Sequence, residues 1–351
     1  MLSDGAPCGV TVERLHCRAC GAAWLPPREA ARLPRRTFGE AYALGAAPPT
    51  AADIARASGY ATRIATLWSG LGTDAAPASI LDVGCGNGAL LGALGAIWPG
   101  VARAGVEPAP RVAAAARRGG LPVSAVLRPG MRAALVLSVN VVEHTPDPRV
   151  FLASLRRAVA PGGVAIIICP DGSLPWIELL MADHRWSLTP AALERLAVQA
   201  GFRVAGREPQ PGGFQALLLR PVPHRRPSAR RLPPPRAARP AAPRRDYLAQ
   251  WRALDGLLAT RRDPGRRLVA FGVGEVARLL RCYAPATWAR IAALTADDAA
   301  GAAPLGRRFI VPSGLGSGDS VLLALRPGVQ PALAARLAGS HVIRWDDRVP
   351  R

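Results

Sequence analysis

Three glycines and a carboxylate near the end of the first quarter of the chain could form a ligand site. Residues 79–94, SILDVGCGNGALLGAL, place an apolar run before Gly84, Gly86 and Gly88 and a helix-like Ala/Leu pattern after them. Glycines let the backbone turn sharply and approach a ligand that a Cβ atom would exclude. A carboxylate at Asp82 favours a ligand with a cationic or hydroxyl-rich part over a pyrophosphate. The stretch predicts a strand, a tight turn and a helix start of a nucleotide-binding unit.

A second carboxylate, Glu107, ends the next apolar run at residues 101–106. A carboxylate in that place can accept two hydrogen bonds from ribose hydroxyls, a feature shared by adenosine and dinucleotide sites. Residues 84–89 also satisfy the looser G-x-G-x-x-A dinucleotide pattern. From these residues alone, a dinucleotide site and a merely structural turn therefore remain open.

The loop after a later apolar run carries a more specific motif. Residues 140–148, NVVEHTPDP, follow the run at 135–139, and residues 152–168 approximate L-x-x-x-L-x-P-G-G before another apolar run. With LDVGCGNG at 81–88, these stretches resemble the class I S-adenosylmethionine-dependent methyltransferases over residues 79–220. The resemblance implies an α/β fold with a doubly wound, Rossmann-like core. It also implies an enzyme that binds S-adenosylmethionine along the glycine turn.

The same resemblance assigns roles to individual residues. The cofactor-binding set would be Asp82, Gly84, Cys85, Gly86, Gly88, Glu107, Asn140 and Val141. His144 would be the base, because it lies in the loop that faces the methyl end of the cofactor, and Glu143 would orient it or share the role. His184 is the second candidate, as a substrate contact. In many members of this family the Glu-His pair serves loop structure instead, and that alternative stays open.

The N-terminal cysteines could hold a metal ion. Cys8 precedes Cys17-Arg18-Ala19-Cys20-Gly21, and a C-x-x-C-G turn presents two thiolates as a structural zinc site does. No second C-x-x-C is present, so a degenerate ribbon that has lost its metal is an equal alternative. A redox pair is less favoured, because no thioredoxin-like strand precedes the motif.

The order of these segments predicts four parts. They are a cysteine-bearing segment at 1–40, a methyltransferase domain at 41–220, a Pro/Arg-rich linker at 221–246 and a smaller α/β domain at 247–351. The last part has its own G-x-G-x-x-A at 272–277, which would suit a nucleotide or be purely structural. This layout resembles the modular nucleotide-sugar C-methyltransferases, which implies a nucleotide-sugar or related acceptor and carbon methylation. An O- or N-methyltransferase of another small metabolite is the alternative chemistry.

Local patterns predict the elements that position the motifs. Apolar spacing of three and four residues predicts a helix over 51–71, and further helices are expected at 111–118 and 149–160. Short apolar runs predict strands, at 80–83, 101–106, 121–126, 135–139 and 164–169. Thr189 is expected to cap a helix that ends near Ala200.

Composition limits the partners. The net charge is +21, yet all 45 basic residues are Arg, which together with abundant Ala, Gly and Pro points to a coding bias rather than to nucleic-acid binding. The Pro/Arg-rich linker has no interleaved aromatics for base stacking. No apolar run reaches 18 residues and no signal peptide is evident, so a cytoplasmic protein is expected. A non-catalytic binding protein remains an alternative, because no acid follows the run at 121–126. The oligomeric state is not indicated.

Overall fold

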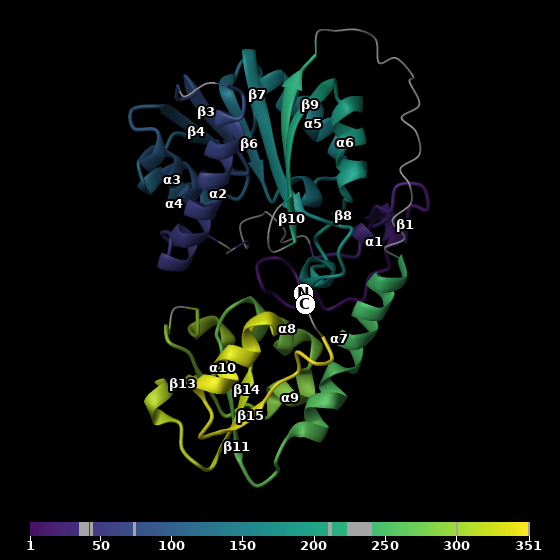
Figure 1. Cartoon of the computed structure of the whole chain (residues 1–351), viewed down its shortest axis with the longest axis vertical. Helices are drawn as coiled ribbons and strands as arrows, with labels where there is room; N and C mark the ends of the chain where they lie inside the picture. Colours follow the sequence, from purple (N-terminus) through teal and green to yellow (C-terminus); the bar gives the residue numbers. More distant parts are fainter. Residues whose placement is uncertain are drawn as a thin grey trace. The chain divides into compact units, whose positions relative to one another are not determined.

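The computed structural model describes residues 1–34, 42, 45–72, 75–209, 213–222, 241–299 and 301–349. The chain divides into two compact units (Figure 1). The first, here the methyltransferase-like unit, comprises Val10–Leu174 and Asp183–Pro240. The second, the C-terminal unit, comprises Ala241–Arg351 together with Met1–Gly9 and Pro175–Ala182.

The methyltransferase-like unit is built on a seven-stranded sheet with the order β5-β4-β3-β6-β7-β10-β9. Neighbouring strands from β5 to β7 are parallel, and β10 runs antiparallel to both β7 and β9. This confirms the predicted doubly wound α/β class. The strands are β3 (Ser79–Val83), β4 (Ala102–Val106), β5 (Val123–Ser124), β6 (Ala133–Val139), β7 (Val159–Pro170), β9 (Phe202–Pro209) and β10 (Phe214–Pro221).

Both faces of this sheet are buried. Along β6, Leu135 and Leu137 belong to one hydrophobic cluster with Leu94 of α3 (Ala89–Ile97). Val136 belongs to a second cluster with Leu152 of α5 (Pro148–Ala158). Side chains alternate between the faces of a strand, so helices must cover both sides. The helices are α2 (Ala51–Ser69), α3 (Ala89–Ile97), α4 (Pro110–Arg118), α5 (Pro148–Ala158) and α6 (Pro190–Gln199). Their positions agree closely with the predicted ones.

Three segments differ from the sequence expectation. The strand expected at 121–126 is reduced to Val123–Ser124, because Pro122 can donate no ladder hydrogen bond and the strand lies at the sheet edge. β7 begins at Val159 rather than at residue 164. The expected linker at 221–246 lies mostly outside the described residues, but its last part, from Ala241, is already helix. Pro243 is tolerated there because it lies in the first turn of α7.

The C-terminal unit holds a smaller parallel sheet with the order β13-β12-β11-β14-β15. The strands are β11 (Arg267–Phe271), β12 (Ala293–Thr295), β13 (Arg308–Phe309), β14 (Asp319–Leu323) and β15 (His341–Ile343). The helices are α7 (Ala241–Arg261), α8 (Glu275–Tyr283), α9 (Pro285–Ala289) and α10 (Gln330–Arg336). It is the predicted second α/β domain.

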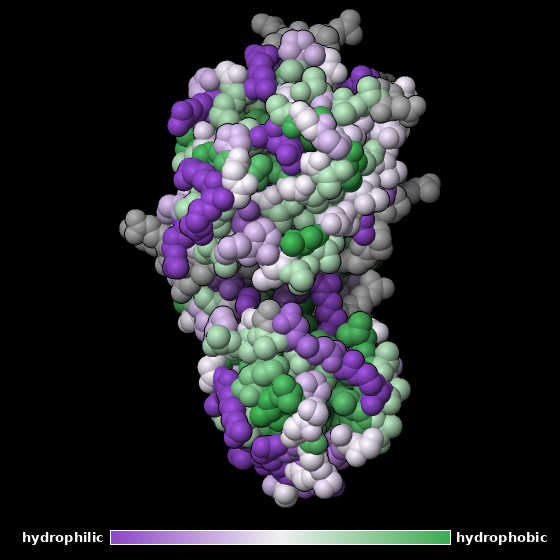
Figure 2. Space-filling view, turned by 90° about the vertical axis from the view of Figure 1, so that its left-hand side faces the viewer, coloured by the Kyte–Doolittle hydropathy of each residue, from purple (hydrophilic) through white to green (hydrophobic). Residues whose placement is uncertain are grey.

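Two early stretches of the chain complete the C-terminal unit. The carbonyl of Met1 accepts a hydrogen bond from the Ala182 amide at 2.7 Å, and the Tyr283 hydroxyl donates to the Leu180 carbonyl at 2.6 Å. On the face shown in Figure 2, hydrophilic side chains lie in separate groups over both units, and a hydrophobic group on the C-terminal unit is bordered by them. In the described parts of the chain, none of the helices has the length and apolar character needed to cross a membrane.

Candidate cofactor and catalytic site

The glycine turn after β3 has a separate physical reason for each glycine. All three have positive φ, at +92° for Gly84, +57° for Gly86 and +82° for Gly88. A Cβ on Gly84 would lie 2.2 Å from a methyl carbon of Val141, and one on Gly88 would lie 2.3 Å from Leu121. On Gly86 a Cβ would meet no described atom within 4 Å. Packing against Val141 therefore requires a glycine at position 84, and the positive φ favours glycine at all three positions. Of the three, Gly86 alone borders open space that a ligand can occupy.

Two carboxylates flank this turn. Glu107, directly after β4, accepts hydrogen bonds from the Gly86 amide at 3.1 Å and the Ala109 amide at 2.8 Å. Asp82 is 2% exposed, and its Oδ1 has no hydrogen-bond partner among the described residues. Burial, and secondarily the negative charge of Glu107, raises the pKa of Asp82 to about 7. Burial also raises the pKa of Glu107. A ligand that brings a positive charge or hydroxyl donors here would relieve both costs.

Asn140 adds an amide at the end of β6. It is the only described non-glycine residue with positive φ, at +57°. Its amide nitrogen donates to the Tyr60 hydroxyl at 3.2 Å, while its Oδ1 is buried without a partner among the described residues. Tyr60 in turn packs edge-on against Phe214, with ring centroids 6.0 Å apart. The strained backbone of Asn140 thus presents an unused acceptor at the edge of the sheet where β3 and β4 also end.

The other predicted cofactor residues contribute packing. The Cys85 side chain is buried, and a Cβ on Gly105 would lie 2.4 Å from its sulfur, so the thiol points toward the sheet. Burial raises the pKa of this thiol, which stays protonated. Val141 covers Gly84 with its side chain. These two residues shape the turn, whereas Asp82, Glu107 and Asn140 supply its polar groups.

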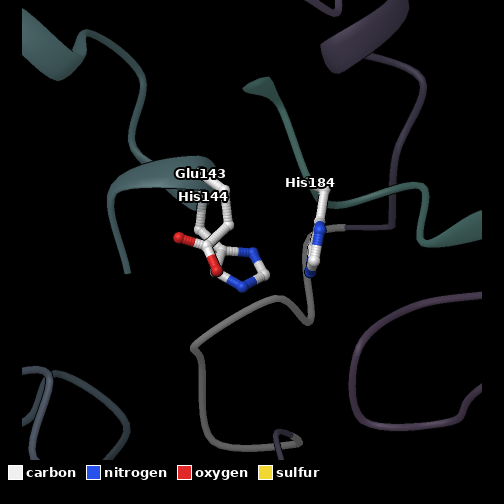
Figure 3. A group of neighbouring side chains, drawn as sticks. All are labelled: Glu143, His144 and His184. Carbon is white, nitrogen blue, oxygen red and sulfur yellow. The ribbon is translucent and has the colours of Figure 1, made fainter. Parts of the chain in front are cut away.

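Glu143, His144 and His184 lie together, as the sequence analysis proposed (Figure 3). Glu143 and His144 belong to the short helix η1 (Val142–His144), and His184 comes from the segment before β8 (Trp186–Ser187). The two imidazole rings meet edge to face with centroids 4.6 Å apart. One donor atom from each of the three side chains lies within 4.8 Å of the others.

The tautomer of His144 follows from its contacts. Its Nδ1 lies 3.1 Å from the backbone carbonyl oxygen of Asp183. A carbonyl only accepts hydrogen bonds, so Nδ1 carries the proton and Nε2 keeps its lone pair. Burial, and next the neighbouring His184, lowers the pKa of His144 to about 4. At neutral pH the ring is therefore uncharged, with Nε2 able to accept a proton or bind a cation.

Long-range contacts hold the two segments in place. The Trp186 indole donates to the Thr145 carbonyl at 2.9 Å, which joins β8 to the loop after η1. β8 pairs with β2 (Ala23–Trp24), and the Arg14 guanidinium donates to the His184 carbonyl. The roles of Arg14, Asp183 and Trp186 were not predicted. They act through backbone atoms of residues far away in sequence, and no local pattern signals such contacts.

The N-terminal cysteines receive no support as a zinc site. Cys8 belongs to the C-terminal unit, whereas Cys17 and Cys20 belong to the methyltransferase-like unit. A hydrogen bond from the Cys20 backbone lowers the pKa of Cys17, and burial raises that of Cys20. Among the described residues, the cluster of His, Cys, Asp or Glu side chains that could hold a metal ion consists of Glu143, His144 and His184, and it contains no cysteine.

Comparisons with known proteins agree with this geometry. Residues 54–205 match the family model described as a methyltransferase domain. A ubiquinone biosynthesis O-methyltransferase of Methylobacterium nodulans is 32% identical over 151 residues, covering 36% of this chain and 60% of the relative. An uncharacterized methyltransferase of Mycobacterium ulcerans is 37% identical over 123 residues, covering 32% of this chain and 48% of the relative.

Solved structures with a similar fold include a mitomycin 7-O-methyltransferase. Its TM-score is 0.41 at 21% identity, with 49% of this chain and 54% of that chain covered. A methyltransferase from Streptomyces caelestis has a TM-score of 0.39 at 16% identity, and the match covers 50% of this chain and 91% of that one. Residues 54–205 therefore belong to a domain that matches the methyltransferase family model, and its strand order is that of a Rossmann-like methyltransferase fold. The chain spans about half to three fifths of the length of the curated relatives named above.

Proposed function

We propose that this protein transfers the methyl group of S-adenosylmethionine to a hydroxyl oxygen of a small molecule, with His144 as the base. The observation that carries the proposal is the hydrogen bond from His144 Nδ1 to the Asp183 carbonyl. It leaves Nε2 of a buried, neutral imidazole as a proton acceptor beside a methyltransferase turn. Relatives named as O-methyltransferases favour oxygen as the accepting atom.

The residues present fit S-adenosylmethionine. The orphaned oxygens of Asp82 and Asn140 would accept hydrogen bonds from its polar groups or face its positive charge, and Glu107 would meet ribose hydroxyls. Gly86 leaves space for the ligand to approach the backbone. When bound, this cofactor supplies a methyl carbon attached to positively charged sulfur.

The chain's own part in the reaction is to position the acceptor and to move one proton. His144 Nε2 takes the hydroxyl proton while the acceptor oxygen forms its bond to the methyl carbon. The bound cofactor would keep the electron pair of the broken carbon–sulfur bond on its sulfur, so charge and atoms would balance. The imidazolium that forms has the Asp183 carboxylate 3.9 Å from Nδ1, which stabilises it. Burial of the site excludes water, which would compete as an acceptor.

The acceptor expected from the sequence, a nucleotide-sugar methylated at carbon, receives no support from the relatives. It stays in the acceptor screen, because the same base could remove a proton next to a sugar ketone. The screen therefore pairs small hydroxyl compounds with nucleotide-sugars and follows methyl transfer by formation of S-adenosylhomocysteine.

The first experiment is calorimetric titration with S-adenosylhomocysteine, with NAD as the control ligand, on the wild-type protein and on Asp82→Asn. Micromolar binding of the first ligand alone, lost in the variant, supports the cofactor assignment. His144→Ala should then lose turnover while it keeps S-adenosylhomocysteine binding. Turnover that survives in His144→Ala excludes the base, and binding of neither ligand favours a non-catalytic protein with a methyltransferase fold.

The same three side chains permit a second role, as ligands of a divalent cation. Glu143, His144 and His184 offer one carboxylate and two imidazoles, a donor set that several divalent metals accept, and the Nδ1 contact of His144 is typical of a metal-bound histidine. A bound cation would activate an acceptor hydroxyl directly. Activity that is lost after chelation and restored by added metal would favour this role over the base. Activity that chelation leaves unchanged would exclude it.

A further inference from the structure

Five arginines surround a depression at the opposite edge of the main sheet. The depression has a volume of about 500 Å³, and Arg132, Arg156, Arg157, Arg203 and Arg220 line it, together with residues 159–163 and Pro221. No lining residue is acidic. We call this feature the arginine basin. It is a concave surface with five formal positive charges.

Most of these charges have no partner. Arg132, Arg157, Arg203 and Arg220 make no ion pair or side-chain hydrogen bond with any described residue. Arg156 is different, because its guanidinium donates to the Gly201 carbonyl at 3.1 Å and to the Val222 carbonyl at 2.9 Å. Those bonds fix Arg156 in place without neutralising it. Elsewhere in the chain many arginines pair with acids, such as Arg267 with Asp319 at 2.7 Å.

The strand register makes the basin destabilising for the fold when no anion is bound. Arg203 of β9 and Arg220 of β10 are direct cross-strand partners in an antiparallel pair. Like charges placed directly opposite each other destabilise a sheet. Two more arginines, Arg156 and Arg157, end the neighbouring helix α5. A polyanion would turn this repulsion into attraction, because guanidinium groups bind phosphate oxygens in pairs.

The basin is separate from the methyl-transfer site. Arg132 immediately precedes β6 and Asn140 immediately follows it. The seven residues of that strand span roughly 23 Å at about 3.3 Å per residue. A ligand in the basin is therefore neither the methyl donor nor the acceptor.

We infer that the arginine basin binds a small polyphosphate anion, as free oligophosphate or as the phosphate chain of a nucleotide. The volume admits a ligand of nucleotide size, and Ala160 and Pro161 offer an apolar surface for an organic group. The inference does not depend on the proposed function, because its residues take no part in that site.

The test compares two charge-matched double variants of the full chain. One is Arg203→Gln with Arg220→Gln, and the control is Arg252→Gln with Arg290→Gln, two exposed arginines of the C-terminal unit. Titrations use inorganic tripolyphosphate and ATP, with saturating S-adenosylhomocysteine present to fill the other site. Affinity of the basin variant for tripolyphosphate should fall at least about tenfold, whereas that of the control should change less than about twofold.

Each outcome decides the inference. Tighter binding of ATP than of tripolyphosphate identifies a nucleotide as the ligand, and equal binding identifies the phosphate chain alone. The basin variant should also melt at a higher temperature than the wild type without anion, and lose the stabilisation that tripolyphosphate gives. Equal affinity of both variants overturns the inference. So does a single-stranded oligonucleotide that binds more tightly than tripolyphosphate and gains affinity with length, since the basin would then serve nucleic acid. Retained S-adenosylhomocysteine binding shows that the basin variant is folded.

Discussion

At the scale of single residues, the proposed methyl-transfer site is assembled from groups whose burial destabilises the protein when no ligand is bound. Asp82 is buried with an unsatisfied oxygen beside a second carboxylate, and His144 is buried beside another histidine. The pKa of Asp82 is raised and that of His144 is lowered, so both shifts favour the neutral form. Such costs persist where a ligand is meant to offset them.

Asp82→Asn should stabilise the free protein and abolish cofactor binding. The pKa of Asp82 is about 7 in the folded state against 3.8 ordinarily, so the folded protein holds a proton that the unfolded chain releases. Stability therefore falls as pH rises from about 4 to about 7, by up to about 4 kcal/mol. Asn removes this loss. Thermal melts at pH 5 and pH 8 should show a gain for the variant that is clearly larger at pH 8 than at pH 5. Equal melting temperatures at pH 8 would contradict the expected burial cost.

His144 should produce the opposite pH dependence. Its folded pKa of about 4 lies below the ordinary 6.5, so the unfolded chain takes up the proton first. Stability should fall as pH drops from about 6.5 to about 4, by at most about 3 kcal/mol. Urea unfolding across this range should show a shallower acid loss for His144→Gln. An acid loss in His144→Gln as steep as in the wild type would contradict this pH dependence.

At the scale of elements, the glycine turn allows two neighbouring substitutions with different consequences. Gly84→Ala would place a methyl against Val141 and should destabilise the fold strongly. In Gly86→Ala the new methyl group meets open space, so the substitution costs only the strain of a positive φ, about 1 kcal/mol. That methyl group would nevertheless occupy the space through which the ligand approaches the backbone. Thermal melts and S-adenosylhomocysteine titrations should separate the two effects. A Gly86→Ala protein with wild-type affinity would show that the ligand does not approach this residue.

The contact between β8 and the loop after η1 should matter for catalysis rather than for cofactor binding. Trp186→Phe removes the indole hydrogen bond to the Thr145 carbonyl, at a cost of about 1 kcal/mol in stability. Because this bond joins the segments of His144 and His184, turnover should fall roughly five- to tenfold while S-adenosylhomocysteine affinity stays unchanged. A parallel loss of turnover and of S-adenosylhomocysteine affinity would show that Trp186 only stabilises the fold.

The elements themselves were largely predictable, because their signals are local. Glycine spacing gave the turn after β3, and apolar periodicity gave α2 and β6. The two histidines were both identified as candidates, but the Asp183 carbonyl and the Trp186 indole that position them act across about 40 residues of sequence. The arginine basin was missed for the same reason. Its five arginines come from four segments, and only the register of β9 and β10 sets two of them face to face.

At the scale of the whole molecule, the C-terminal unit is not a simple appendage. Residues 175–182 belong to it, and Trp176, Leu180 and Met181 are at most 8% exposed. Removing residues 241–351 would uncover this apolar segment and delete the Tyr283 bond to Leu180. The shortened chain should melt at a lower temperature and bind a hydrophobic dye such as ANS. A fully stable, dye-free fragment would show that the two units are independent.

The interleaved chain also sets an order for synthesis on the ribosome. Met1–Gly9 and Pro175–Ala182 are both translated before their partners in the same unit, residues 241–351. Until then these stretches lack the partners against which they pack in the folded protein, although all strands of the main sheet have already been translated. A pause in translation between residues 182 and 241 should therefore prolong the exposure of these stretches and favour aggregation.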